Sequence, residues 1–550
     1  MTHRSAPRGG QAPPPSSHTA SAAAGLPPLP ARTRLATLLG NSAKYLSRTL
    51  KVGSGGMIGG KVALRLDPHL LERLARGRRV VLVTGTNGKS TTTRMIAAAL
   101  SSVGQVATNS GGDNMLDGIA SAFMAAPRAP LAVLEVDEMH LPMVAKATRP
   151  AALVLLNLSR DQLDRVGEIG TIEQRLREAV NACPDAHVIA NADDPLIASA
   201  AWDSGRVTWV AAGTGWNLDS VTSPRTGTPV LRDGEHWYAA PALEGAAVQT
   251  GPGQVPVAEF VRPRPQVWVE RGTETPSGSE FVVRLERSLL GGMDDASPAA
   301  PITRPDLAAV GGQGGAGGAS STDEAVAVKV RLNLPGRANQ ANAAQALAAA
   351  VRLGAQSALA AAVLAELREV AGRYSSVRVD GREVRLLLAK NPAGWQESMS
   401  MFNPDADSVL LAVNGQIPDG EDLSWLWDVD FTAVKCYADA GGPVIACGER
   451  VADLSVRLTY AGIPHRVVET PAQAVACCPN GTVEGLLNYT AFRDYYRELT
   501  LAGYFTPTGS AGATLTARTG ASGAGAACES AVTGGEPEVS GGEKSEEARR

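Results

Sequence analysis

Residues 80–93 read VVLVTGTNGKSTTT and combine an apolar run with a glycine-containing turn. A run of apolar, mostly β-branched residues predicts a buried strand, and the turn TGTNGKST follows it directly. Residues 90–104 (STTTRMIAAALSSVG) then carry apolar side chains at helical spacing. Backbone amides in such a turn, together with the N-terminus of the following helix, favour a bound anion. The stretch therefore predicts a phosphate-binding loop between a strand and a helix.

The glycine spacing of this loop is shorter than usual. A common phosphate loop has its first glycine five residues before the second, where this chain has Val83; the nearest upstream glycine is Gly85, three residues before Gly88. In such a loop Lys89 would contact the outer phosphates and Ser90 would offer its hydroxyl to Mg²⁺. The alternative is an ordinary turn with a solvated lysine. The coincidence of strand, glycines, lysine, serine and helix favours the phosphate site.

Composition limits the class of protein. The chain has 550 residues, of which 44% are hydrophobic and 19% charged, which suits two or three domains with ordinary cores. A net charge of −4 argues against broad nucleic-acid binding. The apolar runs are far shorter than a membrane span, and the N-terminus has no apolar signal core. We therefore expect no nucleic-acid partner, no transmembrane segment and no secretion.

Low-complexity segments divide the chain into two α/β blocks. We expect disordered extensions at residues 1–33 and 506–550, because both are rich in small and polar residues. The first block, 34–330, includes a low-complexity linker at about 290–325. The second and smaller block is 331–505.

The strand pattern predicts the fold class. Continuous apolar runs alternate with helical patterns, as in a mostly parallel, doubly wound sheet whose strands are buried on both faces. In the first block these runs are at residues 131–137, 151–159 and 187–195. The second block reads as a Rossmann-like α/β unit that starts with a helix at 339–354 and has strands near 383–389, 408–415 and 442–448.

The loop and several later motifs resemble one enzyme superfamily. TGTNGKST resembles the G-x-x-G-K-[ST] ATP loop of the Mur ligases and folylpolyglutamate synthases, which activate a carboxylate as an acyl phosphate for attack by an amine. LEVDE (134–138) resembles their acidic strand end, and NADDP (191–195) resembles a strand-end motif of their central domain. The resemblance implies a P-loop ATPase domain that uses ATP and Mg²⁺, with Ser90 and Glu135 at the metal. It implies ATP contacts for Thr86, Asn87, Gly88, Lys89, Ser90 and Thr91.

Two further motifs extend the implied nucleotide site. LPGRANQANAAQALAA (334–349) resembles the family's helix start, which implies that Asn339 contacts the adenine, although Ala338 stands where a histidine or tyrosine is usual. GRYSSV (372–377) resembles the start of the third domain, which implies that Arg373 reaches the ATP phosphates. A surface arginine is the alternative for Arg373.

Departures from the common Mur pattern narrow the family. RDQLDR (160–165) has Gln162 where most Mur ligases have histidine. LLLAKNPAGWQE (386–397) has Leu387 and Lys390 where they have aspartate and histidine. These forms resemble the MurT family, the ligase subunits of lipid II isoglutaminyl synthase. So do NSGGDNMLDGIASAF (109–123), NGQIPDGEDLSWLWDVDF (414–431) and NYTAF (488–492).

The MurT resemblance implies a reaction and a partner. It implies ATP-dependent amidation of the D-glutamate α-carboxylate in the stem peptide of lipid II, with Lys89 as a catalytic residue. This chain shows no G-x-C-x-G nucleophile, so ammonia would come from a separate class I glutamine amidotransferase subunit, GatD in this family. Asp422 and Asp428 are candidates for the aspartate that MurT-like proteins need, with a plain polar turn as the alternative. The implied location is the cytoplasm, at the inner face of the plasma membrane.

The central domain carries an insertion at about 215–270, where MurT-like proteins often have a zinc ribbon. Aligned on that ribbon, this chain lacks all of its thiolate ligands, so we expect no zinc site. The four cysteine positions hold Ser223, Thr226, Val255 and Ala258. We expect the hairpins of the insertion to be held by packing instead, with Trp237 and Trp268 as the candidate side chains.

Two other functions remain open on the sequence alone. One is a Mur- or folylpolyglutamate-type ligase that adds an amino acid instead of ammonia. The other is a non-catalytic scaffold for a glutaminase. Gln162, Leu387 and the Ser-Trp-x-Trp-Asp motif argue against the first, and the intact Lys89 and Ser90 argue against the second.

Overall fold

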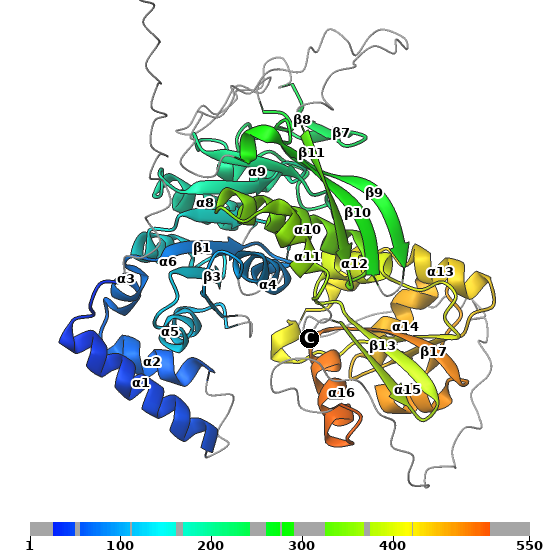
Figure 1. Ribbon diagram of the computed structural model, residues 1–550. Coiled ribbons are helices and arrows are strands. Elements are labelled where there is room, and N and C mark those ends of the chain that lie inside the picture. The colour runs from blue at the N-terminus through cyan, green and yellow to red at the C-terminus, as the bar shows by residue number, and fades with distance from the viewer. Residues whose placement is uncertain are drawn as a thin grey trace, which may run out of the picture.

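Two separate sheets organise the chain in the computed structural model (Figure 1). One sheet has nine strands and the other has six, and a short hairpin, β7 (Val230–Asp233) with β8 (His236–Ala239), stands apart from both. The structure describes residues 26–49, 56–109, 113–160, 169–241, 260–275, 278–290, 325–367, 374–420 and 422–505.

The nine-stranded sheet is parallel except at one edge. Its order is β11-β10-β9-β6-β5-β4-β1-β3-β2, and only β9, β10 and β11 pair antiparallel to one another. The predicted doubly wound α/β fold is thereby confirmed. The strands are β1 (Arg79–Thr84), β2 (Val106–Thr108), β3 (Leu131–Glu135), β4 (Ala152–Leu155), β5 (His187–Asn191), β6 (Val207–Ala211), β9 (Val267–Thr275), β10 (Gly278–Glu286) and β11 (Ala325–Leu332).

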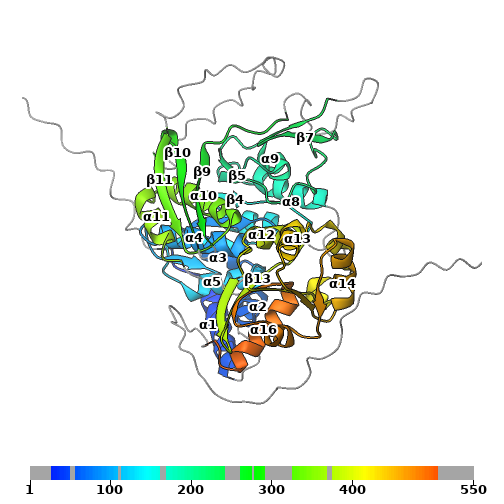
Figure 2. The same ribbon diagram turned by 90° about the vertical axis from the view of Figure 1, so that its right-hand side faces the viewer.

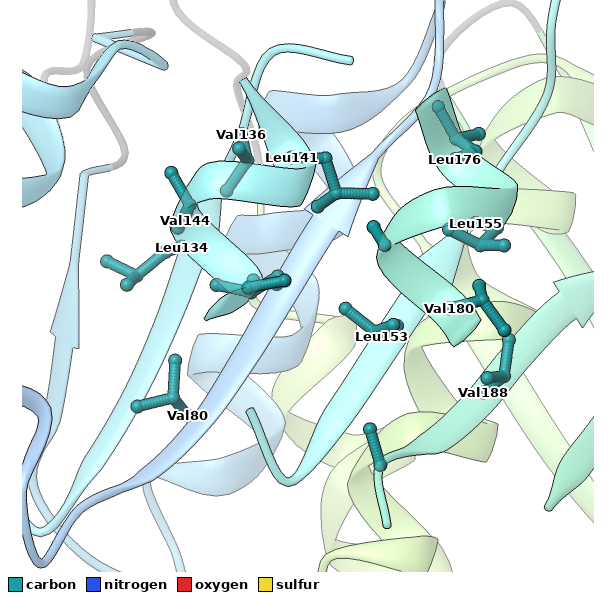
Figure 3. Close-up of a cluster of buried hydrophobic side chains, with 14 of the residues drawn as sticks. Val80, Leu134, Val136, Leu141, Val144, Leu153, Leu155, Leu176, Val180 and Val188 are labelled. Carbon is teal, nitrogen blue, oxygen red and sulfur yellow. The ribbon is translucent and has the colours of Figure 1, made fainter. Parts of the chain in front are cut away.

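Both faces of this sheet are buried, which explains the unbroken apolar runs of its strands. In β1, Val80 and Leu82 point into one core cluster, whereas Val81 and Val83 point into the other. Figure 3 shows the first cluster, where side chains of the parallel strands meet those of the covering helices. The helices of this layer are α3 (Leu70–Ala75), α5 (Leu116–Ala125), α6 (Leu141–Thr148), α8 (Ile169–Asn181) and α9 (Pro195–Ala201), with α1 (Ala31–Thr49) and α2 (Gly56–Leu66) outside α5.

The opposite face is covered by α4 (Lys89–Leu100), α10 (Arg337–Arg352) and α11 (Ser357–Leu364). This differs from the sequence prediction, which assigned the helix at 339–354 to the smaller block. The alanines of α10 are buried on nearly all sides because the helix lies between α4 and strands of the large sheet. A helix that is apolar all round belongs in a core, and here it is the core of the first sheet.

The six-stranded sheet forms the smaller α/β unit. Its order is β12-β13-β17-β14-β15-β16, and all pairs except β12 with β13 are parallel. The strands are β12 (Tyr374–Val379), β13 (Arg382–Leu388), β14 (Ser408–Ala412), β15 (Val444–Cys447), β16 (Arg466–Val467) and β17 (Gly481–Leu487). The helices are α12 (Pro392–Ser400), α13 (Thr432–Asp439), α14 (Val451–Tyr460), α15 (Pro471–Cys477) and α16 (Tyr489–Leu501).

The smaller unit approaches the large sheet where α12 meets α10. In both ribbon views α1, α2 and α16 lie at the same, lower end of the molecule (Figures 1 and 2). None of the helices in the described residues is both long and apolar enough to cross a bilayer. The β1–α4 loop, the start of α10 and the start of α12 lie together, because Gly88 approaches Asn342 and Asn87 approaches Asn391.

Candidate active site

The loop between β1 and α4 makes two turns that only glycine tolerates. Gly85 has φ 139° and Gly88 has φ 83°, and Gly88 caps the N-terminus of α4. A Cβ on Gly85 would lie 2.8 Å from Cβ of Leu156, and one on Gly88 would lie 2.6 Å from Oδ1 of Asn342. Both positions lack space as well as the ordinary backbone conformation. The short glycine spacing is therefore a compact turn packed against two neighbouring elements.

Asn157, which follows β4, holds the loop in shape. Its backbone carbonyl accepts a hydrogen bond from the Thr86 amide at 2.9 Å, and its side-chain oxygen accepts one from the Asn87 amide at 2.9 Å. Its side-chain nitrogen donates to the Asn87 carbonyl at 3.1 Å. The Thr86 hydroxyl donates to the Ser159 carbonyl at 3.1 Å. Sequence reasoning treated Asn157 only as part of a strand, although a polar residue ending an apolar run was a usable signal.

Lys89 is the first residue of α4, and its positive charge is paired with the carboxylate of Glu138. Its Nζ donates to the carbonyls of Gly85 at 2.6 Å and Thr86 at 3.2 Å, and it lies 2.9 Å from Oε1 of Glu138. The two charged side chains are only 9% and 12% exposed. Burial raises the pKa of Glu138, and the nearby Lys89 charge opposes that rise. Glu138 was missed as a site residue, although it is the last letter of the LEVDE motif.

Ser90 and Glu135 form the second pair of the site. The Ser90 hydroxyl donates to Oε2 of Glu135 at 2.7 Å. Asn109 fixes the backbone of Glu135 through two hydrogen bonds of 2.8 Å each. Two neighbouring ligands of an octahedral Mg²⁺ at 2.0–2.1 Å lie about 2.9 Å apart, so this oxygen pair fits that ion. No group of three or more histidine, cysteine, aspartate or glutamate side chains gathers among the described residues, so phosphate and water oxygens would complete such a shell.

The smaller unit and α10 supply the other wall. Asn342 of α10 is buried against Gly88, and Asn87 Nδ2 lies 3.4 Å from Oδ1 of Asn391, which also caps α12 by accepting from the Gly394 amide at 2.8 Å. Asn339, the predicted adenine contact, is half-buried and donates to the Pro335 carbonyl at 2.6 Å. Asn342, which sequence reasoning missed, lies directly against the loop at Gly88.

The other predicted nucleotide residues are placed as follows. Thr91 is buried in the first turn of α4. Arg373 and Gln162 lie outside the described residues. Leu387 is fully buried in the core of the smaller unit, so this position belongs to packing, while Lys390 is half-buried beside it.

The four aspartates of the acidic segment 414–431 have different surroundings. Asp419 is buried, and it accepts hydrogen bonds from the amide and the hydroxyl of Thr490 at the start of α16. Asp430 accepts from the Thr432 amide at 2.9 Å at the start of α13. These two aspartates hold helix ends in place. Of the two candidates from the sequence, Asp422 is exposed and Asp428 is half-buried.

Asp422 borders an open groove of about 380 Å³ on the smaller unit. Its carboxylate accepts from the Ser424 amide at 2.8 Å, and this hydrogen bond lowers the pKa of Asp422. The groove also contains Trp427, which is 53% exposed, and its remaining lining residues are Leu423, Ser424, Leu426, Arg450, Ala452, Asp453 and Val456. Trp425 instead packs inward, with its ring 6.3 Å from that of Trp395. The segment therefore anchors one tryptophan and presents the other.

Asp428 is tied to the large unit through Arg160. The guanidinium of Arg160 lies 3.3 Å from Oδ2 of Asp428 and also pairs with Asp219, whose Oδ2 accepts from the Arg160 amide at 2.8 Å. Trp216 Nε1 donates to the same Asp219 oxygen at 2.7 Å. Arg160 thus links the acidic segment to the insertion that begins near residue 215. Sequence reasoning assigned no role to Arg160, the first residue of RDQLDR.

The insertion holds together by hydrogen bonds and aromatic packing. The Ser223 hydroxyl accepts from the amides of Arg225 and Thr226 at 3.2 Å each. Trp237 is 1% exposed, packs 5.1 Å from the ring of Phe260, and donates to the Ala192 carbonyl at 2.9 Å. The predicted packing role of Trp237 is confirmed, whereas Trp268 lies in β9 of the large sheet. Val255 and Ala258 lie outside the described residues.

Comparisons with known proteins agree on the class. The Mur ligase middle domain family matches residues 83–215, and the MurT ligase C-terminal family matches residues 388–492. MurF from Acinetobacter baumannii superposes with a TM-score of 0.53 at 14% identity, over 81% of this chain and 80% of that chain. MurF ligase from Thermotoga maritima in complex with ADP gives a TM-score of 0.50 at 13% identity, over 78% and 81%. Fold and site together define a protein of the Mur ligase class.

A curated relative identifies the family within that class. The lipid II isoglutaminyl synthase (glutamine-hydrolyzing) subunit MurT of Streptococcus pneumoniae is 30% identical over 458 residues, which span 80% of this chain and 89% of the relative. The chain belongs to the MurT family.

Proposed function

We propose that this chain is the ligase subunit of a lipid II isoglutaminyl synthase. It converts the D-glutamate α-carboxylate of the lipid II stem peptide to the amide of D-isoglutamine, with ATP as the activating agent and ammonia from a separate glutaminase subunit. The observation that carries the proposal is the pair of contacts at the loop, Lys89 with Glu138 and Ser90 with Glu135. A second support is the C-terminal region of the same chain, residues 388–492, which matches the MurT ligase C-terminal family.

The reaction needs two steps because an ionised carboxylate does not react with ammonia. First, a carboxylate oxygen attacks the γ-phosphorus of ATP, ADP leaves, and an acyl phosphate forms. Second, the nitrogen of ammonia attacks the acyl carbon, inorganic phosphate leaves with the bonding electrons, and the nitrogen loses a proton. The protein contributes alignment of the reactants and stabilisation of the charge on the transferred phosphoryl group.

Each loop residue has a distinct part in the first step. Lys89 places a positive charge beside the transferred phosphoryl group, and Glu138 fixes the position of that ammonium before the substrates arrive. Ser90 and Glu135 would hold Mg²⁺, which when bound supplies charge neutralisation on the phosphates. Asn157 keeps Thr86 and Asn87 in the conformation that presents the helix N-terminus to the phosphates. Thr91, Asn339 and Arg373 stay predicted contacts to ATP.

The second step requires nitrogen from outside this chain. Cys447 is fully buried, and burial raises the pKa of its thiol to about 12, which suits a structural thiol and not a nucleophile. We infer a class I glutamine amidotransferase subunit of the GatD kind as the source of ammonia. The groove beside Asp422, with its exposed Trp427, has the composition of a partner contact, because tryptophan is enriched at interface hot spots. The complex would act in the cytoplasm at the inner face of the plasma membrane, where lipid II presents its stem peptide.

The test is an amidation assay with the co-expressed glutaminase subunit, lipid II, ATP and Mg²⁺. We expect amide formation with glutamine and also with ammonium alone, and loss of both in Lys89→Ala. Lys435→Ala serves as the matched control, because that side chain is 43% exposed and pairs with Asp439 one turn further along α13. ATP turnover only on addition of a free amino acid would instead indicate an amino-acid ligase. Glutaminase assembly without any ATP turnover would indicate a scaffold.

A further inference from the structure

The N-terminal helix α1 exposes its large apolar side chains to solvent and buries its small ones, the reverse of an ordinary surface helix. Its largest side chains face solvent: Leu38 is 63% exposed, Tyr45 72% and Leu46 59%. Leu35 and Leu39 are exposed on the same side, at 58% and 40%. The spacing of positions 35, 38, 39, 45 and 46 places these residues on one continuous face of the helix. A contiguous apolar face of this kind marks a contact surface.

Close packing on the inner side of α1 explains why the large residues point outward. Ala36 and Gly40 are buried, and a Cβ on Gly40 would lie 2.6 Å from the carbonyl oxygen of Gly59 in α2. In turn, the amide of Gly60 donates to the Ser121 hydroxyl of α5 at 3.0 Å. Three helices are thus stacked through small residues. Large apolar side chains fit only on the outer side of this stack.

The middle helix of this stack, α2, also exposes apolar side chains. Met57 is 48% exposed, Ile58 38% and Leu66 39%. Both helices lie at the lower end of the molecule, on the same side as α16 of the smaller unit (Figures 1 and 2). Exposed apolar side chains of both helices therefore gather at one end of the fold.

The charge of this segment is opposite to that of the whole chain. The first acidic residue in the sequence is Asp67, whereas the net charge of the chain is −4. Residues 26–66 contain no aspartate or glutamate and seven cations: Arg32, Arg34, Lys44, Arg48, Lys51, Lys61 and Arg65. Arg34 lines a shallow groove on α1 together with Leu38, Tyr45 and Leu46, so positive charge and apolar surface are adjacent.

We propose that α1 and α2 form a docking element that lies flat on an anionic phospholipid surface. A helix with leucine and tyrosine on one face and only cations among its charges has the chemistry of an interfacial helix, since the apolar face enters the headgroup region and the cations meet lipid phosphates. A water-soluble protein partner would not require the complete absence of acidic residues. The inference rests on the proposed function only for its purpose, which is to hold the enzyme where a lipid-linked substrate is found.

Vesicle binding of the full-length chain, co-expressed with its glutaminase subunit, tests this element without any catalysis. We expect the complex to co-float with vesicles of phosphatidylcholine containing about 30% phosphatidylglycerol, and to bind pure phosphatidylcholine and high-salt samples much more weakly. The double variant Leu38→Ser/Leu46→Ser should lower partitioning about tenfold or more. Arg34→Glu should lower it about tenfold on anionic vesicles only.

Leu359→Ser is the matched control, because Leu359 of α11 is 50% exposed and α11 covers the large sheet, away from the proposed element. It should leave vesicle binding unchanged. Equal binding of Leu38→Ser/Leu46→Ser and the unmodified chain would overturn the proposal. So would a concentration-dependent dimer in light scattering that the double variant abolishes, with no vesicle binding in either form.

A pair of substrates separates this inference from the proposed function. The double variant should amidate a water-soluble stem peptide at the rate of the unmodified chain, yet lose rate on lipid II embedded in anionic vesicles. If neither substrate is amidated while vesicles still bind, the proposed function fails and the docking element stands. If both substrates are amidated equally by both forms and vesicles do not bind, the docking element fails and the function stands.

Discussion

The nucleotide loop and the acidic segment 414–431 are both polar, but the loop buries and pairs its main charges, whereas the acidic segment exposes Asp422. At the loop, Lys89 and Glu138 are nearly buried and joined at 2.9 Å. In the acidic segment, Asp422 lies at the edge of an open groove beside the exposed Trp427. The first region is arranged for a small ligand of fixed shape. The second presents a surface that another molecule would complete.

The difference indicates a division of labour within one chain. Buried, paired charges are pre-positioned and interact strongly in a region of low dielectric, as stabilisation of phosphoryl transfer requires. Exposed charges contribute little on their own, because water and salt screen them until a partner excludes both. We therefore expect the loop to govern carboxylate activation and the acidic segment to govern delivery of nitrogen.

Lys89→Ala should have the largest effect. Loss of the ammonium removes the charge beside the transferred phosphoryl group and leaves Glu138 buried without its partner, so we expect amidation to fall about 10³-fold. The rates with glutamine and with ammonium should fall equally, because both need the acyl phosphate. Steady-state amidation rates with each nitrogen source measure this. A loss confined to glutamine would place Lys89 in nitrogen delivery.

Asp422→Asn should separate the two nitrogen sources. If this carboxylate acts toward the glutaminase partner, we expect the glutamine-dependent rate to fall about 10²-fold while the ammonium-dependent rate stays unchanged. Asp428→Asn should instead lower both rates by about tenfold, because Asp428 holds Arg160 between the two units. Parallel assays with glutamine and with ammonium distinguish these outcomes. Equal losses with both sources in Asp422→Asn would show that the acidic segment also acts in activation.

Gly88→Ala should weaken the loop itself. A side chain at φ 83° is strained and would meet Asn342 Oδ1 at 2.6 Å, so we expect a loss of about 2 kcal/mol in ATP binding. Calorimetric titration with ATP measures the change. Adding Asn342→Ala should recover about half of it, because the clash is removed and the backbone strain remains. Full recovery would show that the left-handed backbone contributes no strain, and no recovery would show that Asn342 is not the limiting neighbour.

The free energy of unfolding should depend on pH differently in the two units. Of the changes predicted for this chain, this is the smallest. Burial raises the pKa of Asp194, which caps α9 in the large unit, to about 6, and raises the pKa of Glu484 in the smaller unit to about 7. A raised carboxyl pKa means that the folded state holds its proton longer than the unfolded state, so stability falls as pH rises toward the folded pKa. We expect slopes of up to about 1 kcal/mol per pH unit.

Isosteric amides assign these slopes to the units. Asp194→Asn should flatten the stability curve of the large unit between pH 4 and pH 6, and Glu484→Gln should flatten that of the smaller unit up to pH 7. Urea unfolding at several pH values measures both. Unchanged slopes would mean that these carboxyls are ionised in the folded chain across this range.

Local sequence patterns predicted the fold and the core of the loop well. The β1 and α4 elements and the turn between them follow from residues adjacent in the sequence, whereas the roles of Lys89 and Ser90 stay predictions. The placement of α10 did not follow, because its alanine-rich pattern fits any core and only tertiary packing selects the large sheet.

The site residues missed by sequence reasoning all come from other parts of the chain. Asn157 reaches the loop from the segment after β4 and Asn342 reaches it from α10, while Arg160 reaches Asp428 across the two units. No local pattern specifies such meetings, since they depend on strand order and on how the units pack. Glu138 was within reach of sequence reasoning, as it ends the same acidic motif as Glu135.

The claim that the Lys89 loop activates the carboxylate, independently of the acidic segment, is tested most directly by following oxygen from the substrate to phosphate. Lipid II labelled with ¹⁸O in the D-glutamate α-carboxylate would be incubated with the complex, ATP, Mg²⁺ and ammonium, and the inorganic phosphate would be analysed by mass spectrometry. Activation at the Lys89 loop predicts one ¹⁸O atom in phosphate for each amide formed, at a rate that Asp422→Asn leaves unchanged. Amide formation with unlabelled phosphate would contradict the account.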